Sequence, residues 1–246
     1  MDAIPYSKLA EHYDRLMGHV HYDLWANSIA KLLKRNKHKP KRLLELGAGT
    51  CKLAHYLDIP SLDLRVHTDL SLPMLQAAQP GFAWERVACD ACAIPFGDAE
   101  FDFVLMCYDA VNYLSAAQIR SLFSEVKRVL EPNGLFLFDI TTEENSLEWF
   151  EDYCDAFEAD GKMLVRRSSY DAVTRTQHNW IDIFEPMEGD QYRRVNEHHE
   201  QYIYTVPLLC EWLGEGGLML VDLVDAGSLR QATPKSDRIH FVVVPK

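Results

Sequence analysis

The chain has 246 residues, 48% hydrophobic and 25% charged, which is enough for a single elaborated domain spanning residues 1–246. The formal net charge of −12 and the pI of about 5.2 disfavour nucleic acid and anionic membranes as partners, because such partners are usually met by basic surfaces. The first residues lack a charged-then-apolar leader, no apolar run approaches membrane length, and the six cysteines are scattered. We therefore expect a cytoplasmic protein that is a monomer or a homodimer and does not associate with membranes.

The N-terminal segment, residues 1–38, is predicted to form a helical cap. Residues 6–35 carry apolar side chains at helical spacing, with a break at Gly18 and a second helix that begins near Tyr22. The second helix is predicted to end at Lys37–Pro40, because proline disfavours helix continuation.

Strand-like and helix-like segments alternate after this cap. Ser71 is predicted to cap a helix that runs to Gln79 and stops at Pro80–Gly81, and Ser115 to cap a helix that runs to Leu130. The strand-like segments are Arg42–Leu46, Leu64–Thr68, Ala83–Ala88, Phe101–Met106 and Leu135–Ile140. This alternation indicates a doubly wound α/β fold.

Residues 160–206 are predicted to form an antiparallel insertion. They contain three long segments of alternating polarity, 163–170, 177–185 and 192–204. A helix at Pro207–Leu213 and two closing strands, Leu218–Val224 and Ile239–Val244, follow. The predicted fold is a doubly wound, mostly parallel seven-stranded sheet, Rossmann-like, with an antiparallel β insertion after the fifth strand.

The first predicted strand ends in a loop suited to a nucleotide. Gly47 and Gly49 remove side chains where the backbone must turn and approach a ligand, and a helix-compatible segment follows. Asp69 ends the second strand about twenty residues later, the separation expected of a carboxylate that accepts the hydroxyls of an adenosine ribose. Lys52 stands where a dinucleotide fingerprint has its third glycine, which disfavours the alternative of an NAD-linked oxidoreductase.

Four motifs in this order resemble those of class I S-adenosylmethionine (SAM)-dependent methyltransferases. The loop Glu45-Leu-Gly-Ala-Gly-Thr is similar to the first motif, and the resemblance implies that Gly47, Ala48 and Gly49 pass under the methionine part of SAM. By the same resemblance, Glu45 helps to hold the methionine ammonium group.

The remaining motifs extend this implied cofactor site. In the second, Asp69 would bind the ribose, with Leu70 and Met74 against the adenine, although these two residues alone would be read as ordinary core. The third contributes Asp90 and Ala91 to the adenine, and Asp90 alone could equally be a loop cap. The fourth, Phe101 to Tyr108, brings Cys107 to the border of the reaction centre.

Further residues resemble a subgroup that acts on small molecules and includes sugar-amine N-methyltransferases. In this subgroup an N-terminal helical pair closes over the cofactor, which implies roles for Tyr13, Tyr22, Trp25 and Asn112 in the cofactor site. The alternative for the three aromatic residues is helix packing onto the sheet.

Two features depart from related patterns. Cys51 stands where most family members have a third glycine, and a small side chain is tolerated there if the residue has helical dihedrals. An Asp/Asn-Pro-Pro-Tyr/Phe sequence is absent after the fourth strand, which disfavours methylation of nucleobase or glutamine amino groups.

Methyl transfer from a sulfonium needs mainly positioning and exclusion of water, and a base only where the acceptor is protonated. Tyr108, Asp109 and the pair His198-His199 could serve, and we predict His198 and Tyr108 as catalytic residues, the former from strand parity with Tyr202. The alternative places both histidines on the surface. Trp180, Arg194 and Tyr202 of the insertion are candidates for the substrate side.

The predicted function is SAM-dependent methyl transfer to nitrogen or oxygen of a small metabolite. No metal is expected in this chemistry, because Asp109 with Asn112 is a poor match to a magnesium site, and Cys89 and Cys92 lack a second ligand pair. The alternatives are a SAM-binding module without activity and an RNA-modifying methyltransferase.

Overall fold

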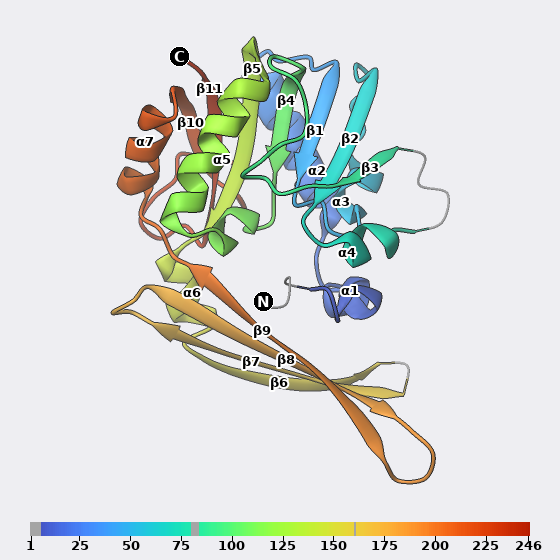
Figure 1. Ribbon diagram of the computed structural model, residues 1–246. Coiled ribbons are helices and arrows are strands. Elements are labelled where there is room, and N and C mark those ends of the chain that lie inside the picture. Colours follow the sequence, from blue (N-terminus) through green and yellow to red (C-terminus); the bar gives the residue numbers. More distant parts are fainter. Residues whose placement is uncertain (1–5, 80–83, 160) are drawn as a thin grey trace.

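A seven-stranded sheet forms the centre of the larger part of the molecule in this computed structural model (Figure 1). The structure describes residues 6–79, 84–159 and 161–246. The predicted helix end at Pro80–Gly81 and the predicted strand start at Ala83 therefore lie outside the described residues.

The sheet confirms the predicted architecture. Its strand order is β10-β11-β5-β4-β1-β2-β3, in which β1 to β5 are parallel and β11 runs antiparallel to both β5 and β10. The strands are β1 (Arg42–Leu46), β2 (Leu64–Asp69), β3 (Glu85–Ala88), β4 (Phe101–Met106), β5 (Leu130–Thr141), β10 (Leu218–Asp225) and β11 (Arg238–Pro245). Because the parallel strands share one direction, the loops at their carboxyl ends gather along one edge.

Helices cover both faces of this sheet. The helices α2 (Tyr22–Arg35) and α3 (Lys52–Tyr56) pack on one face, and α5 (Ala116–Val129) and α7 (Val206–Glu215) pack on the other (Figure 1). Ser115 caps α5 in a capping box with Gln118, as the predicted start of this helix requires.

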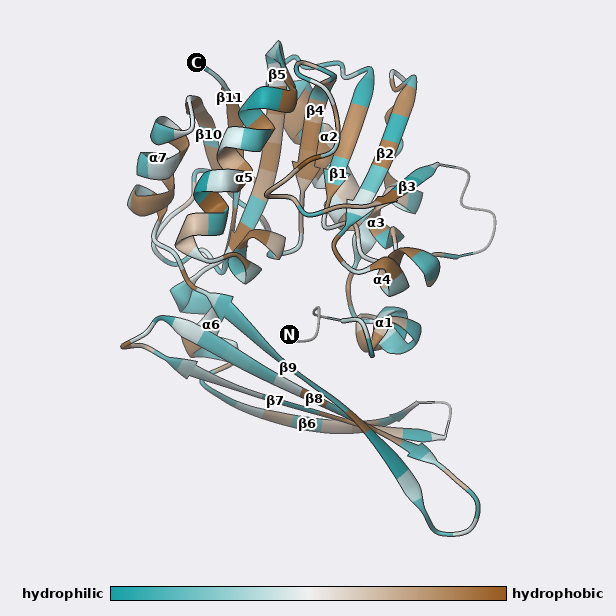
Figure 2. Cartoon of the chain, in the orientation of Figure 1, coloured by the Kyte–Doolittle hydropathy of each residue, from teal (hydrophilic) through white to brown (hydrophobic). Residues whose placement is uncertain are grey.

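Alternation along the strands explains why both faces are covered. Leu43 and Phe103 belong to the apolar cluster that contains α2, whereas Leu44 and Val104 belong to the cluster that contains α5. All four side chains are fully buried, and burying each contributes roughly 1.5–3 kcal/mol. Figure 2 shows these central strands as hydrophobic, with more polar residues on the outer faces of the helices.

The insertion forms a separate four-stranded antiparallel sheet below the carboxyl edge of the main sheet (Figure 1). Its strands, in spatial order, are β6 (Asp152–Ala159), β7 (Lys162–Asp171), β8 (Thr176–Pro186) and β9 (Tyr192–Tyr202). The predicted boundary at residue 160 is therefore wrong, because β6 belongs to this sheet. Described side chains of β6 alternate between exposed and half-buried, and none is fully buried, so the strand carries only a weak hydrophobic signal.

Helix α4 (Leu72–Gln76) lies between β2 and β3 in the chain, and the 3-10 turn η1 (Ala110–Tyr113) lies between β4 and α5. Helix α6 (Glu143–Trp149) connects the main sheet to the insertion. Helix α6 was not predicted from the sequence.

The N-terminal segment joins the two sheets. Helix α1 (Ala10–Leu16) packs Leu9 and Leu16 against Ile181 and Ile183 of β8, while α2 packs on the main sheet. Within the described part of the chain, no helix combines the length and apolar character needed to cross a bilayer.

Candidate active site

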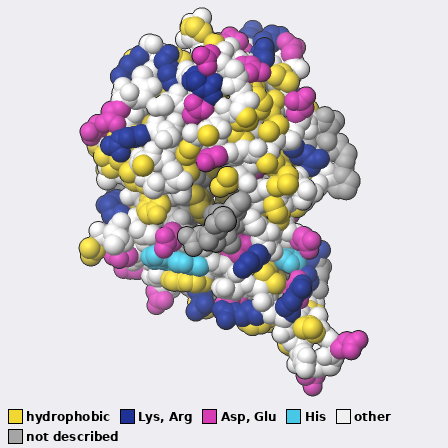
Figure 3. Space-filling model, in the orientation of Figure 1, with side chains coloured by type: hydrophobic (Ala, Val, Ile, Leu, Met, Phe, Trp, Pro, Cys, Tyr) yellow, Lys and Arg dark blue, Asp and Glu magenta, His cyan; other side chains and the backbone are white. Residues whose placement is uncertain are grey.

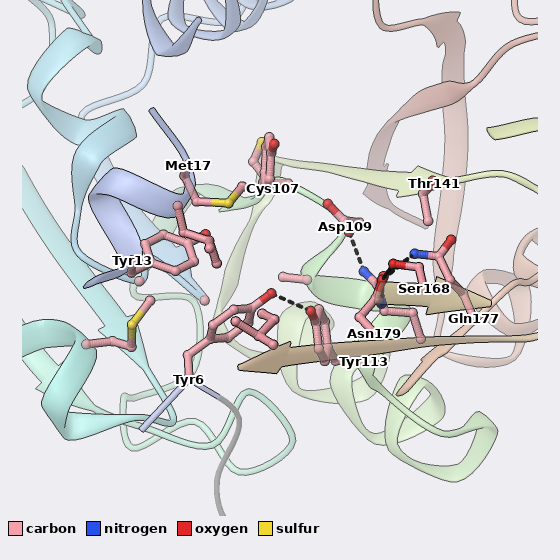
Figure 4. Close-up of a pocket in the computed structure, with 18 of the residues that line it drawn as sticks. Tyr6, Tyr13, Met17, Cys107, Asp109, Tyr113, Thr141, Ser168, Gln177 and Asn179 are labelled. Atoms are coloured by element: carbon pink, nitrogen blue, oxygen red, sulfur yellow. Dashed lines mark hydrogen bonds between the residues drawn. The ribbon is translucent and has the colours of Figure 1, made fainter. Parts of the chain in front are cut away.

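A cavity of about 640 Å³ lies between the carboxyl edge of the main sheet and the β6–β9 sheet. This volume falls within the roughly 300–1,000 Å³ typical of small-molecule sites. Residues that follow β1, β2, β3 and β4 line one side, the insertion lines the other, and Tyr6 and Tyr13 of the N-terminal segment enter between them (Figure 4).

The glycine loop forms part of this cavity. Gly47 and Gly49 have φ angles of 67° and 58°, a region that side chains rarely adopt. A Cβ at Gly47 would lie 3.1 Å from the Cβ of Ala110, and one at Gly49 would lie 3.3 Å from the Cε of Met74. The loop therefore leaves a cradle that substitution would fill, which fits the close approach of a cofactor.

Cys51 has left-handed dihedrals, with φ 57° and ψ 26°. The helical conformation under which a side chain would be tolerated is thus not present, and a left-handed residue with a side chain costs about 1–2 kcal/mol. Burial offsets this cost, because the Cys51 side chain is fully enclosed beside Ala54, Leu75 and Ala78. Burial also raises the pKa of the thiol well above its ordinary value.

Asp69 lies at the end of β2 and lines the cavity. Its two oxygens accept hydrogen bonds from the backbone N–H groups of Gly49 and Ser71, both at 2.8 Å. These bonds fix the carboxylate, and each oxygen keeps a lone pair that can accept from a ligand hydroxyl. Burial raises the pKa of Asp69, partly offset by the two backbone donors.

Four other predicted cofactor residues line the cavity beside Asp69: Leu70, Met74, Asp90 and Ala91. Leu70 is 51% exposed, whereas Met74 is buried under the loop. Asp90 accepts a hydrogen bond from the N–H of Cys92 at 2.8 Å, so it is also a loop cap.

A smaller cavity of about 40 Å³ adjoins the glycine loop. It is lined by the predicted residues Tyr22, Trp25, Glu45 and Ala48, and it shares Tyr13, Gly47, Gly49 and Cys107 with the main cavity. Glu45 is 3% exposed, and one of its carboxylate oxygens lies 2.5 Å from Nδ1 of His67.

The end of β4 is strained at two consecutive residues. Tyr108 and Asp109 have φ angles of 65° and 53°, and both backbone N–H groups donate to the carboxylate of Asp139, at 2.5 and 3.0 Å. A guanidinium nitrogen of Arg238 donates to Asp109 and Asp139, at 2.8 and 2.6 Å. Gln201 of β9 donates to the other oxygen of Asp109.

The charge in this cluster is not balanced, since two carboxylates face one guanidinium. Burial raises the pKa of Asp109, an effect that Arg238 partly offsets. Burial also raises the pKa of Tyr108 well above its ordinary value, so its phenol is protonated at neutral pH.

Two predicted site residues, Asn112 and His198, line neither cavity. Asn112 is fully buried, its amide donates to the carbonyls of Thr141 and Tyr202, and its oxygen accepts from the N–H of Thr141. Its polar atoms are therefore occupied by the protein, so we correct the cofactor role to a structural one. His198 lies on the outer face of β9, so its predicted catalytic role is also wrong.

The prediction of His198 from its strand parity with Tyr202 failed because both faces of β9 carry polar side chains. Glu197, His199 and Gln201 are each less than 7% exposed and face inward, which turns the even-numbered residues outward. Of the insertion residues predicted for the substrate side, Trp180 borders the cavity, but its ring stacks with His198 on the outer face of the sheet, and Arg194 and Tyr202 do not line the cavity.

Sequence reasoning missed a group of amide and hydroxyl side chains on the insertion wall. Gln177 donates to Asn179 and Gln201, both at 3.1 Å, and Ser168 donates to Asn179 at 2.8 Å (Figure 4). The parity of Gln177, Asn179 and Gln201 on two paired strands is the signal that could have identified them.

Comparisons with known proteins find methyltransferases. Residues 44–138 match the family model described as "Methyltransferase domain". The protein named "Putative methyltransferase GWCH70_2453" of Geobacillus sp. (strain WCH70) is 28% identical over 96% of this chain and 98% of its own length.

Solved structures share the complete fold. A SAM-dependent methyltransferase from Clostridium acetobutylicum ATCC 824 superposes with a TM-score of 0.81 at 24% identity, over 98% of both chains. The sugar N-methyltransferase KedS8 from Streptoalloteichus sp ATCC 53650 superposes with a TM-score of 0.75 at 16% identity, over 94% of this chain and 92% of KedS8.

Residues 44–138 thus match a methyltransferase domain, and the doubly wound sheet with a glycine loop at its carboxyl edge is the fold that this chain shares with solved SAM-dependent methyltransferases. The cradle left by Gly47 and Gly49 fits the close approach of SAM, the cofactor that the sequence motifs imply.

Proposed function

We propose that the protein transfers the methyl group of SAM to an amino nitrogen of a polar small molecule. The observation that carries this proposal is Asp109, whose side chain retains 14% exposure and lines the cavity at the end of β4. Its cluster with Asp139 and Arg238 has a formal charge of −1, which favours a cationic or hydrogen-bond-donating group over an anionic one.

We propose that SAM occupies the part of the cavity beside the glycine loop. Asp69 would then accept from the ribose hydroxyls, Leu70 and Met74 would contact the adenine, and Asp90 and Ala91 would bind its edge. Glu45 would face the methionine end from the smaller cavity. When bound, SAM supplies a methyl group already activated by its sulfonium charge, so the protein needs mainly to position the reactants and to exclude water.

The methyl acceptor would occupy the remainder of the cavity, between Asp109 and the insertion. Asp109 would accept a hydrogen bond from the amino group and orient it, while Gln177, Asn179 and Ser168 offer uncharged donors and acceptors to hydroxyl groups. The likeness to KedS8, a sugar N-methyltransferase, supports an amino-bearing, hydroxyl-rich acceptor.

We also propose functions for the segments of this single domain. Residues 1–38 would act as a cap that encloses the cofactor, because Tyr6 and Tyr13 line the cavity and α1 packs on the insertion. The insertion would select the acceptor, since it forms the wall opposite the glycine loop.

The direct test is a screen of amino-bearing small molecules with purified protein and SAM, following S-adenosylhomocysteine and the mass of the product. We expect turnover with amines and none with their N-acetyl or hydroxyl analogues. Turnover confined to hydroxyl or carboxyl acceptors would contradict nitrogen methylation.

Asp109→Asn separates the acceptor role from the cofactor role. The variant should raise the KM for the amine by a factor that corresponds to about 1.5–3 kcal/mol, with SAM affinity unchanged. The matched variant Asp90→Asn should instead weaken SAM binding. Equal kinetics of Asp109→Asn and wild type would exclude a contact between Asp109 and the acceptor.

A further inference from the structure

The outer face of the insertion carries a cluster of metal-ligating side chains that the methyl transfer does not use. His178 of β8 and His198 and Glu200 of β9 each offer a ligand atom, and the three atoms lie within 4.8 Å of one another. None of the three residues lines the cavity. Figure 3 shows histidine side chains gathered on the surface of this sheet, beside hydrophobic and basic ones.

From this cluster we infer a binding site for a divalent transition metal ion of the Zn²⁺ type, held by His178, His198 and Glu200. Imidazole nitrogens and a carboxylate oxygen form a ligand set that zinc commonly adopts in proteins.

The spacing of the ligand atoms supports this assignment. Nδ1 of His178 lies 3.1 Å from Nε2 of His198 and 3.5 Å from a carboxylate oxygen of Glu200. Two nitrogens at the usual zinc distance of about 2.0–2.1 Å, arranged tetrahedrally, are themselves roughly 3.3 Å apart. The ion would replace the hydrogen bond that now joins the two rings, with a small adjustment of side chains.

The strand pairing holds these side chains on one face. His178 is directly opposite Glu200, and His198 is opposite Trp180, so the ligands occupy neighbouring cross-strand positions. The ring of Trp180 stacks with His198 at 4.9 Å and with His178 at 5.7 Å, which restricts both imidazoles. The ligands are thus preorganised on two paired strands, as a metal site requires.

The charges around the cluster permit a cation. Arg167 lies over Trp180 on the same face, but its guanidinium is paired with Asp182 at 3.3 Å.

Three protein ligands leave one tetrahedral position for water or another ligand, so we expect an exchangeable site. The ion would link β8 to β9 directly behind Gln177, Asn179 and Gln201, which face the cavity from the same strands. Metal binding should therefore make β8 and β9 more rigid on the side that faces the proposed acceptor part of the cavity.

The experiment is a Zn²⁺ titration of untagged full-length protein with a competing indicator. We expect one micromolar site per chain in the wild type and in the control variant His21→Gln, whose histidine is exposed at the start of α2. His178→Gln and His198→Gln should each lose affinity by about 10–100-fold or more, since even residues behind metal ligands contribute that much.

Thermal unfolding gives a second readout. Zn²⁺ should raise the melting temperature of the wild type and of His21→Gln, and leave that of His178→Gln unchanged. Anomalous scattering from wild-type crystals grown with Zn²⁺ should place the ion between β8 and β9, which tests the site even if a variant does not fold. Absence of micromolar binding, equal affinity in all variants, or an ion located elsewhere would overturn the inference.

Discussion

Removal of the Arg238 guanidinium should lower the stability of the folded protein strongly. In Arg238→Gln, the carboxylates of Asp109 and Asp139 lose the donor that contacts them at 2.8 and 2.6 Å. Asp139 is fully buried, so water does not replace that donor there. Breaking a buried ion pair by removing one partner costs about 3–5 kcal/mol.

This cost should be visible in thermal and urea unfolding. A loss of about 3–5 kcal/mol corresponds to a fall of roughly 6–20 °C in melting temperature for a domain of this size. Arg120→Gln is the matched control, because Arg120 and its partner Glu215 are 45% and 47% exposed and such a pair contributes about 1 kcal/mol or less.

The effect of pH has a defined sign. Burial raises the pKa of Asp109 in the folded protein, and loss of Arg238 should raise it further. A carboxyl group whose folded pKa exceeds its unfolded value binds more protons when folded, so stability falls as pH rises between the two values. Arg238→Gln should therefore be closer to wild type at pH 5 than at pH 8.

A second substitution tests the same reasoning. Asp109→Asn in the Arg238→Gln background should recover part of the lost stability, because it removes one of the two unpaired charges. An Arg238→Gln variant that loses no more stability than Arg120→Gln, or that is least stable at pH 5, would refute the account of this cluster.

Three further outcomes follow from the site. Asp69→Ala should weaken SAM binding in calorimetry by about 1–3 kcal/mol, and unchanged affinity in the folded variant would exclude the ribose contact. Burial opposes ionisation of Glu197, but hydrogen bonds from His199 and from two backbone N–H groups of the N-terminal segment hold its pKa below the ordinary value. Glu197→Gln should therefore speed amide hydrogen exchange in the N-terminal segment at pH 7. The difference from wild type should shrink as the pH falls through the depressed pKa of folded Glu197, because the wild-type carboxylate is then protonated as well. Equal exchange in the two proteins at pH 7 would argue against this attachment of the segment. Asn112→Ala should lower the free energy of unfolding by about 1–3 kcal/mol with little change in SAM affinity, and the opposite pattern would restore Asn112 as a cofactor ligand.

The main sheet was predictable because its signals are local. The strands Arg42–Leu46 and Phe101–Met106 were predicted with the bounds that the structure gives, and both are short apolar runs bounded by turns. The glycine loop was predictable for the same reason, since two glycines directly after a strand specify backbone geometry within a few residues.

The insertion was less predictable because its burial depends on distant segments. The ends of strand β6 are set by its pairing with β7, and the hydrophobic alternation along its own residues is weak. The inward face of β9 is set by contacts such as that of Glu197 with the N-terminal segment, about 190 positions away in the chain. A polar strand carries no sequence signal for which of its faces meets such partners.

The strained end of β4 links the proposed acceptor site to the stability of the main sheet. Tyr108 and Asp109 hold left-handed dihedrals at a cost of order 1–3 kcal/mol each, and the Asp139 carboxylate that accepts both N–H groups offsets this cost. Asp139 and Arg238 lie on the paired strands β5 and β11, so rigid elements fix the orientation of Asp109. Among the described residues of the insertion, Gln201 hydrogen-bonds Asp109, so under our proposal the insertion could change with the acceptor while the main sheet keeps Asp109 in place.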